Sequence, residues 1–194
     1  MKVSRIAFAA AIVLSITAST GAVAQPGPMP VVSGLTTPGT KTDPDCVVLY
    51  MGAGGNFFAS AIRHQAENAR RRFPKAMVEV RRHQDVRRLP ATCRNPLFIG
   101  HSMGALRAVK QGNAHARGRV ISIDPPNWYP NNGITWQPRV VLTAKVPTVN
   151  FFHCPPSPFG CGKVKGARNV DLSKERRGHV RLPYSPLITQ EVTR

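Results

Sequence analysis

The chain has 194 residues, and 27 Lys and Arg residues stand against 9 Asp and Glu residues, which gives a formal net charge of +18. This length is enough for one domain with a hydrophobic core and excludes a second domain of similar size. Few aromatic residues lie among the basic clusters at 70–72, 81–82 and 87–88, so no specific nucleic-acid binding is expected. The charge has two interpretations: a solvated surface that keeps the protein soluble, or electrostatic association with an anionic membrane surface or polymer. We expect a monomer.

Residues 1–24 have the pattern of a secretory signal peptide. Lys2 and Arg5 precede an apolar run at 6–16, and the small residues Ala22 and Ala24 flank Val23 just before Gln25. The apolar run is too short for a comfortable membrane span. We therefore expect cleavage after Ala24 and a secreted or periplasmic protein. Residues 25–45, rich in Pro, Gly, Thr and Ser, are predicted to form an extended arm before a domain at 46–194.

From residue 46 onward, short apolar segments alternate with helical patterns. Strands are predicted at 46–51, 76–80, 97–100, 120–123, 146–152 and 167–172, and helices at 62–73, 103–111 and after Pro186. The segment 81–96 is long enough for a parallel crossover, although it has little helical pattern and two prolines. The alternation predicts an α/β fold, with a mostly parallel sheet of about six strands and helices on both faces.

The motif Gly100-His101-Ser102-Met103-Gly104 matches G-x-S-x-G and lies between a predicted strand and a predicted helix. Such a turn raises the serine hydroxyl above the carboxyl ends of the strands, where open α/β sheets bind ligands. A five-residue match also arises by chance, and an ordinary strand-to-helix turn is the alternative. In this context we interpret Ser102 as a nucleophile.

A serine nucleophile needs a general base, and six histidines are candidates. His179 is preferred because it lies late in the chain, after the last predicted strand, which fits the order serine, acid, histidine. His153 ends a strand and is the second candidate. His101 occupies a variable position of the motif, where its side chain is expected to support the turn.

The acid that orients the base has two candidates. Asp124 directly follows the strand at 120–123, so its carboxylate is expected at the same sheet edge as Ser102. Alternatively, Asp124 only stabilises the turn before Pro125 and Pro126. Asp171 is the rival, eight residues before His179. For the developing oxyanion, the loop at 51–55 and the backbone N–H of Met103 are the expected donors.

The four cysteines, Cys46, Cys93, Cys154 and Cys161, predict two disulfides in an exported chain, with three pairings open. They contain no CxxC motif and no spacing typical of structural zinc, so no metal is expected.

These motifs resemble those of the α/β-hydrolase superfamily, and more narrowly the small lidless bacterial lipases and esterases. The matching stretches are MGAGG at 51–55, GHSMGA at 100–105, GARNV at 166–170 and GHVRLPYS at 178–185. The resemblance spans about residues 46 to 190. It implies a minimal α/β-hydrolase fold, Ser102 as nucleophile, His179 as base, the amides of Ala53 and Met103 as oxyanion hole, and no cofactor.

The chain departs from that family at two points. Met51 replaces the histidine that usually precedes the glycine loop, and no carboxylate follows the strand that ends at His153, where the family's acid stands. Asp124, after the preceding strand, is then the expected acid. The implied fold also favours the disulfides Cys46–Cys93 and Cys154–Cys161.

We therefore expect an exported serine hydrolase that cleaves carboxylic esters through an acyl-enzyme on Ser102, with His179 as base and Asp124 as acid. Thioesters and amides remain open as substrates. The alternative is a catalytically inactive protein of the same fold that binds anionic partners through its basic surface.

Overall fold

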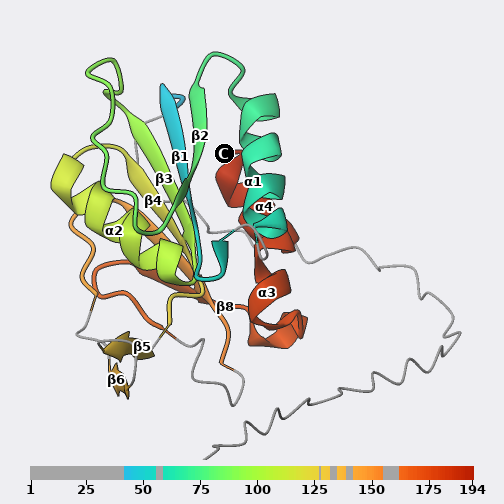
Figure 1. The fold of residues 1–194 in the computed structure, drawn as a ribbon. Helices are drawn as coiled ribbons and strands as arrows, with labels where there is room; N and C mark the ends of the chain where they lie inside the picture. Colours follow the sequence, from blue (N-terminus) through green and yellow to red (C-terminus); the bar gives the residue numbers. More distant parts are fainter. Residues whose placement is uncertain (1–41, 56–58, 127, 132–134, 139–141, 155–161) are drawn as a thin grey trace, which may run out of the picture. The chain divides into compact units, whose positions relative to one another are not determined.

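Six parallel strands form the centre of the fold (Figure 1). The computed structural model describes residues 42–55, 59–126, 128–131, 135–138, 142–154 and 162–194. The sheet has the order β2-β1-β3-β4-β7-β8, and every neighbouring pair is parallel. Its members are β1 (Cys46–Met51), β2 (Met77–Arg82), β3 (Pro96–His101), β4 (Arg119–Ile123), β7 (Thr148–Phe152) and β8 (Arg168–Asp171). The predicted α/β fold is confirmed, whereas the predicted signal peptide lies outside the described residues.

The central strands are apolar because both faces of the sheet are covered. In β1, Val47 and Leu49 belong to the hydrophobic cluster on one face, and Val48 and Tyr50 to the cluster on the other. All four side chains are inaccessible to solvent. Burial of a Val or Leu side chain stabilises a fold by about 1.5 to 3 kcal/mol, so these short runs dictate where the sheet forms.

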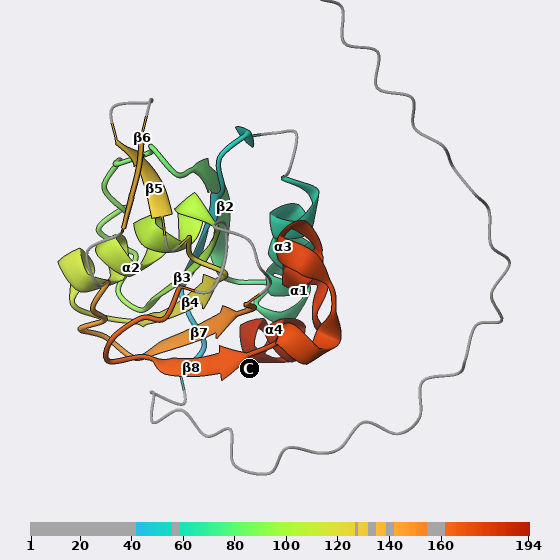
Figure 2. The ribbon, with the colours of Figure 1, turned by 90° about the horizontal axis from the view of Figure 1, so that it is seen from below.

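Helices cover both faces, as the sequence predicts. Helices α1 (Ser60–Arg72) and α4 (Pro186–Val192) lie on one face, and α2 (Met103–His115) lies on the opposite face (Figures 1 and 2). Helix α1 turns its small and apolar residues inward and ends just before Phe73 and Pro74.

Helix α2 is longer than its sequence pattern predicts. The pattern predicts an end at Gly112, whereas the helix continues to His115 and Ala116 takes the left-handed conformation beyond it. A Cβ at Gly112 would lie 2.4 Å from Val120 Cγ2. Gly112 is therefore required for close packing of the helix on the sheet and does not end it.

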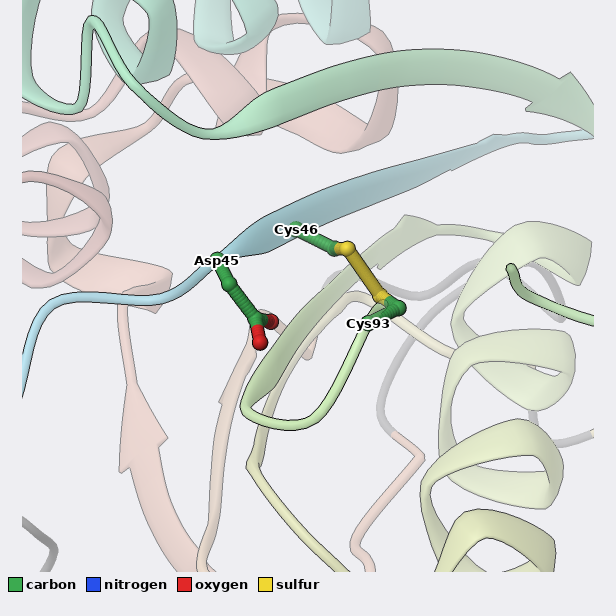
Figure 3. Close-up of side chains that lie close together, drawn as sticks. All are labelled: Asp45, Cys46 and Cys93. Atoms are coloured by element: carbon green, nitrogen blue, oxygen red, sulfur yellow. A yellow bond between two sulfur atoms is a disulfide. The ribbon is translucent and has the colours of Figure 1, made fainter. Parts of the chain in front are cut away.

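The connection from β2 to β3 contains no helix between residues 83 and 95, in agreement with its weak helical pattern. The disulfide Cys46–Cys93 ties this connection to the start of β1, with the two Cα atoms 5.6 Å apart (Figure 3). Asp45 adds two bonds, because its carboxylate accepts the backbone N–H groups of Arg94 and Asn95. The favoured Cys46–Cys93 pairing is confirmed; Cys161, and with it the second pairing, lies outside the described residues.

The antiparallel strands β5 (Trp128–Asn131) and β6 (Thr135–Pro138) form a separate hairpin that the sequence analysis did not predict. The chain then returns to β7 and β8, and continues through the 3-10 turn η2 (Ser173–Glu175), the short helix α3 (Gly178–Arg181) and the 3-10 turn η3 (Leu182–Tyr184). Within the described ranges, no helix has the length and apolar character needed to cross a membrane.

Candidate active site

Four adjacent strands end at one edge of the sheet, and each is followed by a residue of the candidate site. Gly52 follows β1, Ser102 follows β3, Asp124 follows β4 and His153 follows β7. Because all four strands are parallel, their carboxyl ends meet at the same edge. Residues that lie up to about 100 positions apart in the chain are thereby gathered in one place.

Ser102 lies in a sharp turn between β3 and α2. Its backbone has φ 57° and ψ −126°, a conformation that a residue with a side chain rarely adopts. The flanking glycines allow this turn: a Cβ at Gly100 would lie 2.1 Å from Gly104 O, and one at Gly104 would lie 2.1 Å from Tyr50 O. The Ser102 N–H donates to Ile123 O across 2.9 Å and fixes the turn to β4. This is the strained geometry that the G-x-S-x-G motif predicts.

The glycine loop after β1 packs directly against this turn. A Cβ at Gly52 would lie 2.9 Å from Ser102 Cβ and 3.4 Å from Ser102 Oγ, so only glycine leaves room there. The next residue, Ala53, is exposed, and Gly54 and Gly55 have positive φ. The loop therefore adjoins Ser102.

His83 supports this loop, a role that was not predicted from the sequence. Its Nδ1 donates to Gly52 O across 3.2 Å, while its own carbonyl accepts Arg107 Nε of α2 across 2.7 Å. Burial lowers the pKa of His83, which favours the neutral ring. His83 lies in the irregular β2–β3 connection, where no periodicity predicts which side chains point inward.

The predicted base and acid are in contact. His179 Nδ1 lies 2.6 Å from Asp124 Oδ2, and the Asp124 side chain is completely buried. Asp124 itself has a positive φ of 47°, and its backbone N–H donates to Phe151 O across 2.6 Å. A buried carboxylate beside an imidazole holds the ring in one orientation and one tautomer.

Asp171, the rival acid, occupies a different environment. It is exposed at the end of β8, and its Oδ1 accepts the Ser173 backbone N–H across 2.8 Å. Hydrogen bonds from the Ser173 side chain and backbone lower the pKa of Asp171. Its hydrogen bonds therefore start the turn η2, and none of those found among the described residues reaches His179.

His101, next to Ser102, holds the segment that carries His179. Its Nε2 donates to the His179 carbonyl across 2.9 Å, and the two ring centroids are 4.6 Å apart. His101 is buried, and burial, followed by the neighbouring His179, lowers the pKa of His101 to about 3. The ring is therefore neutral near pH 7, and its Nε2 carries the proton because a carbonyl only accepts.

The segment after His179 is anchored in the core. Leu182 is 1% exposed, and Gln65 of α1 donates to Pro183 O across 2.5 Å and to Thr189 Oγ1 across 3.1 Å. These contacts fix the segment directly after α3 against the helical layer. The position of His179 thus depends on residues from α1 as well as on His101.

His153 lies on the other side of Asp124. Its Nδ1 is 2.7 Å from Asp124 Oδ2, and its backbone N–H donates to Asp124 Oδ1 across 3.2 Å. Although this distance is short, the geometry at Nδ1 is not that of a hydrogen bond. Both ring nitrogens, Nδ1 and Nε2, are buried and make no hydrogen bond among the described residues. The 2.7 Å separation is therefore a close electrostatic contact that lacks hydrogen-bond alignment.

Ser102 and His179, the predicted nucleophile and base, are not bonded to one another. Among the described residues, Ser102 Oγ makes no hydrogen bond with His179, while Met103 directly follows Ser102 as the first residue of α2. Ser102 and His179 are both partly exposed. The site thus has a serine hydroxyl and an imidazole on partly exposed residues, and the imidazole contacts a buried carboxylate.

A cavity of about 560 Å³ lies beside the ends of β1 and β2, and its lining is strongly charged. Arg81 in its wall is bonded to Glu79, and Arg87 to both Glu79 and Asp85. Met51, just before Gly52, also lines the cavity. The residues that line the cavity are Met51, Val80, Arg81, Arg82, Gln84, Asp85 and Arg87.

One cluster of atoms of the kinds that bind metals does not form a metal site. Asp45, Cys46 and Cys93 bring a carboxylate oxygen and two sulfurs within 4.8 Å of one another (Figure 3). The two sulfurs are joined in a disulfide, so neither is available as a thiolate, the form that binds metal.

Comparison with solved structures gives a distant structural likeness. No family model matches this chain, and no curated protein matches it. Among solved structures, the chain is similar to one described as RedJ with a PEG molecule bound in its active site, at 16% sequence identity and a TM-score of 0.40. The similarity covers 78% of this chain and 94% of RedJ.

Proposed function

We propose that this protein is an α/β-hydrolase-type serine hydrolase that cleaves carboxylic esters through an acyl-enzyme on Ser102. The observation that carries the proposal is the 2.6 Å contact between His179 Nδ1 and the buried Asp124 Oδ2 at the sheet edge where Ser102 occupies its strained turn. A strained strand-to-helix turn by itself is compatible with several functions. A turn next to a buried carboxylate–imidazole pair is the arrangement that activates a serine.

In this mechanism Ser102 Oγ attacks the ester carbonyl, and His179 Nε2 takes the hydroxyl proton. The Asp124 carboxylate only accepts, so the proton on His179 is at Nδ1, which leaves Nε2 free as the base. His179 then passes the proton to the leaving alcohol. A water molecule activated in the same way releases the acid. The hydrogen bond between Ser102 Oγ and His179 Nε2 forms when substrate binds, since hydrogen bonds between catalytic groups are often long in enzymes without substrate.

The developing oxyanion is held by the backbone N–H groups of Ala53 and Met103. Their assignment is supported by the packing of Gly52 against Ser102, because this contact brings the loop after β1 next to the nucleophile. Donors that are fixed before reaction stabilise the transition state most, and removal of one such donor typically lowers kcat by about 10² to 10³. His83 fixes the loop by binding Gly52 O.

We propose that the protein acts outside the cytoplasm. The buried Cys46–Cys93 disulfide supports this location, because such bonds persist mainly in oxidising compartments.

A fluorophosphonate probe, which reacts with activated serines, tests the proposed function. We expect stoichiometric labelling at Ser102 in the parent protein and none in Ser102→Ala. Ser173→Ala, which alters a partly exposed serine of η2, is the matched control and should label like the parent. Failure of a folded parent protein to label would overturn the hydrolase and favour the basic binding protein. Rates on p-nitrophenyl esters of increasing chain length, compared with thioesters and amides, then define the substrate.

A further inference from the structure

Two imidazoles contact the same oxygen of one buried carboxylate. We propose that His153 is a positioning residue that shares Asp124 with His179 and moderates how strongly this carboxylate attracts the catalytic imidazole. The inference rests on the proposed function for its catalytic meaning, but the coupling between the two histidines is measurable in the protein without any substrate.

The contacts around Asp124 leave its carboxylate few other partners. Oδ1 accepts the His153 backbone N–H, whereas Oδ2 lies 2.6 Å from His179 Nδ1 and 2.7 Å from His153 Nδ1. The two rings are nearly parallel, with centroids 6.5 Å apart and 22° between their planes. A carboxylate oxygen has two lone pairs, so it can accept from both rings at once.

His153 has no other polar partner for its ring within the part of the chain that the structure describes. The residue is 5% exposed, and neither ring nitrogen makes a hydrogen bond. A buried donor without a partner costs about 1 to 3 kcal/mol. The contact of Nδ1 with Asp124 Oδ2 is therefore the polar interaction that explains the position of this ring.

Sharing the carboxylate has a defined electrostatic effect. A second N–H near Oδ2 stabilises the negative charge of Asp124, so less of that charge is available to stabilise a protonated His179. The other titratable ring against His179 is His101 from β3, while Arg177 and Arg181 flank it in the sequence, the former paired with Glu175. Asp124 is the carboxylate in direct contact with His179, so its charge dominates the balance.

The test compares two substitutions at the same position. His153→Leu removes the ring N–H, whereas in His153→Asn the amide nitrogen occupies nearly the place of Nδ1 and keeps a donor there. In the Ser102→Ala chain, proton NMR follows the titration of the His179 ring, assigned by its loss in His179→Gln. We expect His153→Leu to move the titration midpoint of His179 upward by about 0.5 to 1 pH unit, and His153→Asn to leave it within about 0.2 units.

The same substitutions in the active chain give the kinetic test. With His153→Leu, the acidic limb of the kcat/KM profile should move to higher pH by the same amount, and kcat/KM at its optimum should fall about tenfold because the carboxylate is less firmly held. His153→Asn should restore most of this loss. His64→Asn, which alters a ring that lies tilted beside Tyr184, is the control and should behave like the parent.

Three results would overturn the inference. They are an unchanged titration in His153→Leu, a loss of activity and melting temperature with no movement of the acidic limb, and identical behaviour of the Leu and Asn variants. If the Leu variant does not fold, His153→Gln replaces it, because its amide reaches the Nε2 position and not Nδ1. The His153→Leu variant can show a shifted His179 titration while the fluorophosphonate fails to label the folded parent chain. This combination would refute the hydrolase and leave the shared carboxylate standing.

Discussion

Asp124 is the residue on which the choice between the two candidate acids depends. We expect Asp124→Asn to lower kcat by about 10³ to 10⁴, because an amide cannot hold the His179 tautomer that leaves Nε2 basic. Asp171→Asn is the matched control, since that carboxylate bonds Ser173 at the surface, and its kcat should stay within about twofold of the parent. Steady-state hydrolysis of a p-nitrophenyl ester measures both. Parent-like activity of Asp124→Asn would assign the acid elsewhere.

His101 links stability to pH. Its pKa is lowered from 6.5 to about 3 by burial, so the unfolded chain binds a proton below pH 6.5 that the folded chain refuses until about pH 3. Stability is therefore unaffected by this residue above pH 6.5 and falls as the pH drops through that window. At pH 5 the loss is about 2 kcal/mol.

His101→Gln tests this linkage. Its amide keeps a donor for the His179 carbonyl but does not titrate, so the variant should lose about 2 kcal/mol less than the parent between pH 7 and pH 5. Urea unfolding at the two pH values measures the difference. Parallel losses in the two proteins would show that His101 is solvated or is protonated normally in the folded state.

Some residues of the candidate site were predictable and others were not. Ser102 follows from a local motif, and Asp124 and His179 follow from their places after strands and from chain order. Their catalytic roles remain predictions, although the expected contact between Asp124 and His179 is present. His83 was not predictable, because it acts from an irregular connection through a backbone carbonyl. The position of His153 at a strand end was evident, but its contact with Asp124 depends on side-chain directions that no sequence pattern encodes.

At the scale of elements, the turn at Ser102 depends on the absence of side chains around it. We expect Gly104→Ala to destabilise the protein by at least about 2 kcal/mol, because the added Cβ would meet the Tyr50 carbonyl, a backbone atom that cannot move aside. Lys110→Ala, an exposed position of the same helix, should change stability by less than about 0.5 kcal/mol. Urea unfolding measures the free energy of unfolding of both variants and of the parent. A stable Gly104→Ala variant would mean that α2 is not packed this closely on β1.

The limits of sequence prediction are clearest in the irregular elements. The six strands were predicted to within about two residues. The four central strands are buried, whereas the flanking strands β2 and β8 are only partly buried. The β5–β6 hairpin was missed, since the two strands have four residues each and no alternating pattern. The end of α2 was misplaced because Gly112 was interpreted through its backbone preference, whereas the sheet requires it for space.

At the scale of the whole molecule, the disulfide restrains a large part of the chain. Cys46 and Cys93 are 47 residues apart, and the loop that they close contains α1 and β2. Loss of the bridge in a Cys46→Ala/Cys93→Ala double variant should lower the free energy of unfolding by on the order of 3 to 4 kcal/mol, mainly by freeing the unfolded chain. Guanidinium unfolding measures the change. A loss below about 1 kcal/mol would mean that the bonds of Asp45 already hold this connection.

The two edge strands of the sheet affect whether copies of this protein can associate strand to strand. The flanking strand β2 contains Arg81, a charge buried against the sheet and bonded to Glu79, and the other flank, β8, has only four residues and ends at the exposed Asp171. Inward charges and short terminal strands impede the addition of a further strand from a neighbouring chain. The fold should therefore resist growth into continuous fibrils, even though its interior strands, taken out of context, have the apolar character that favours them.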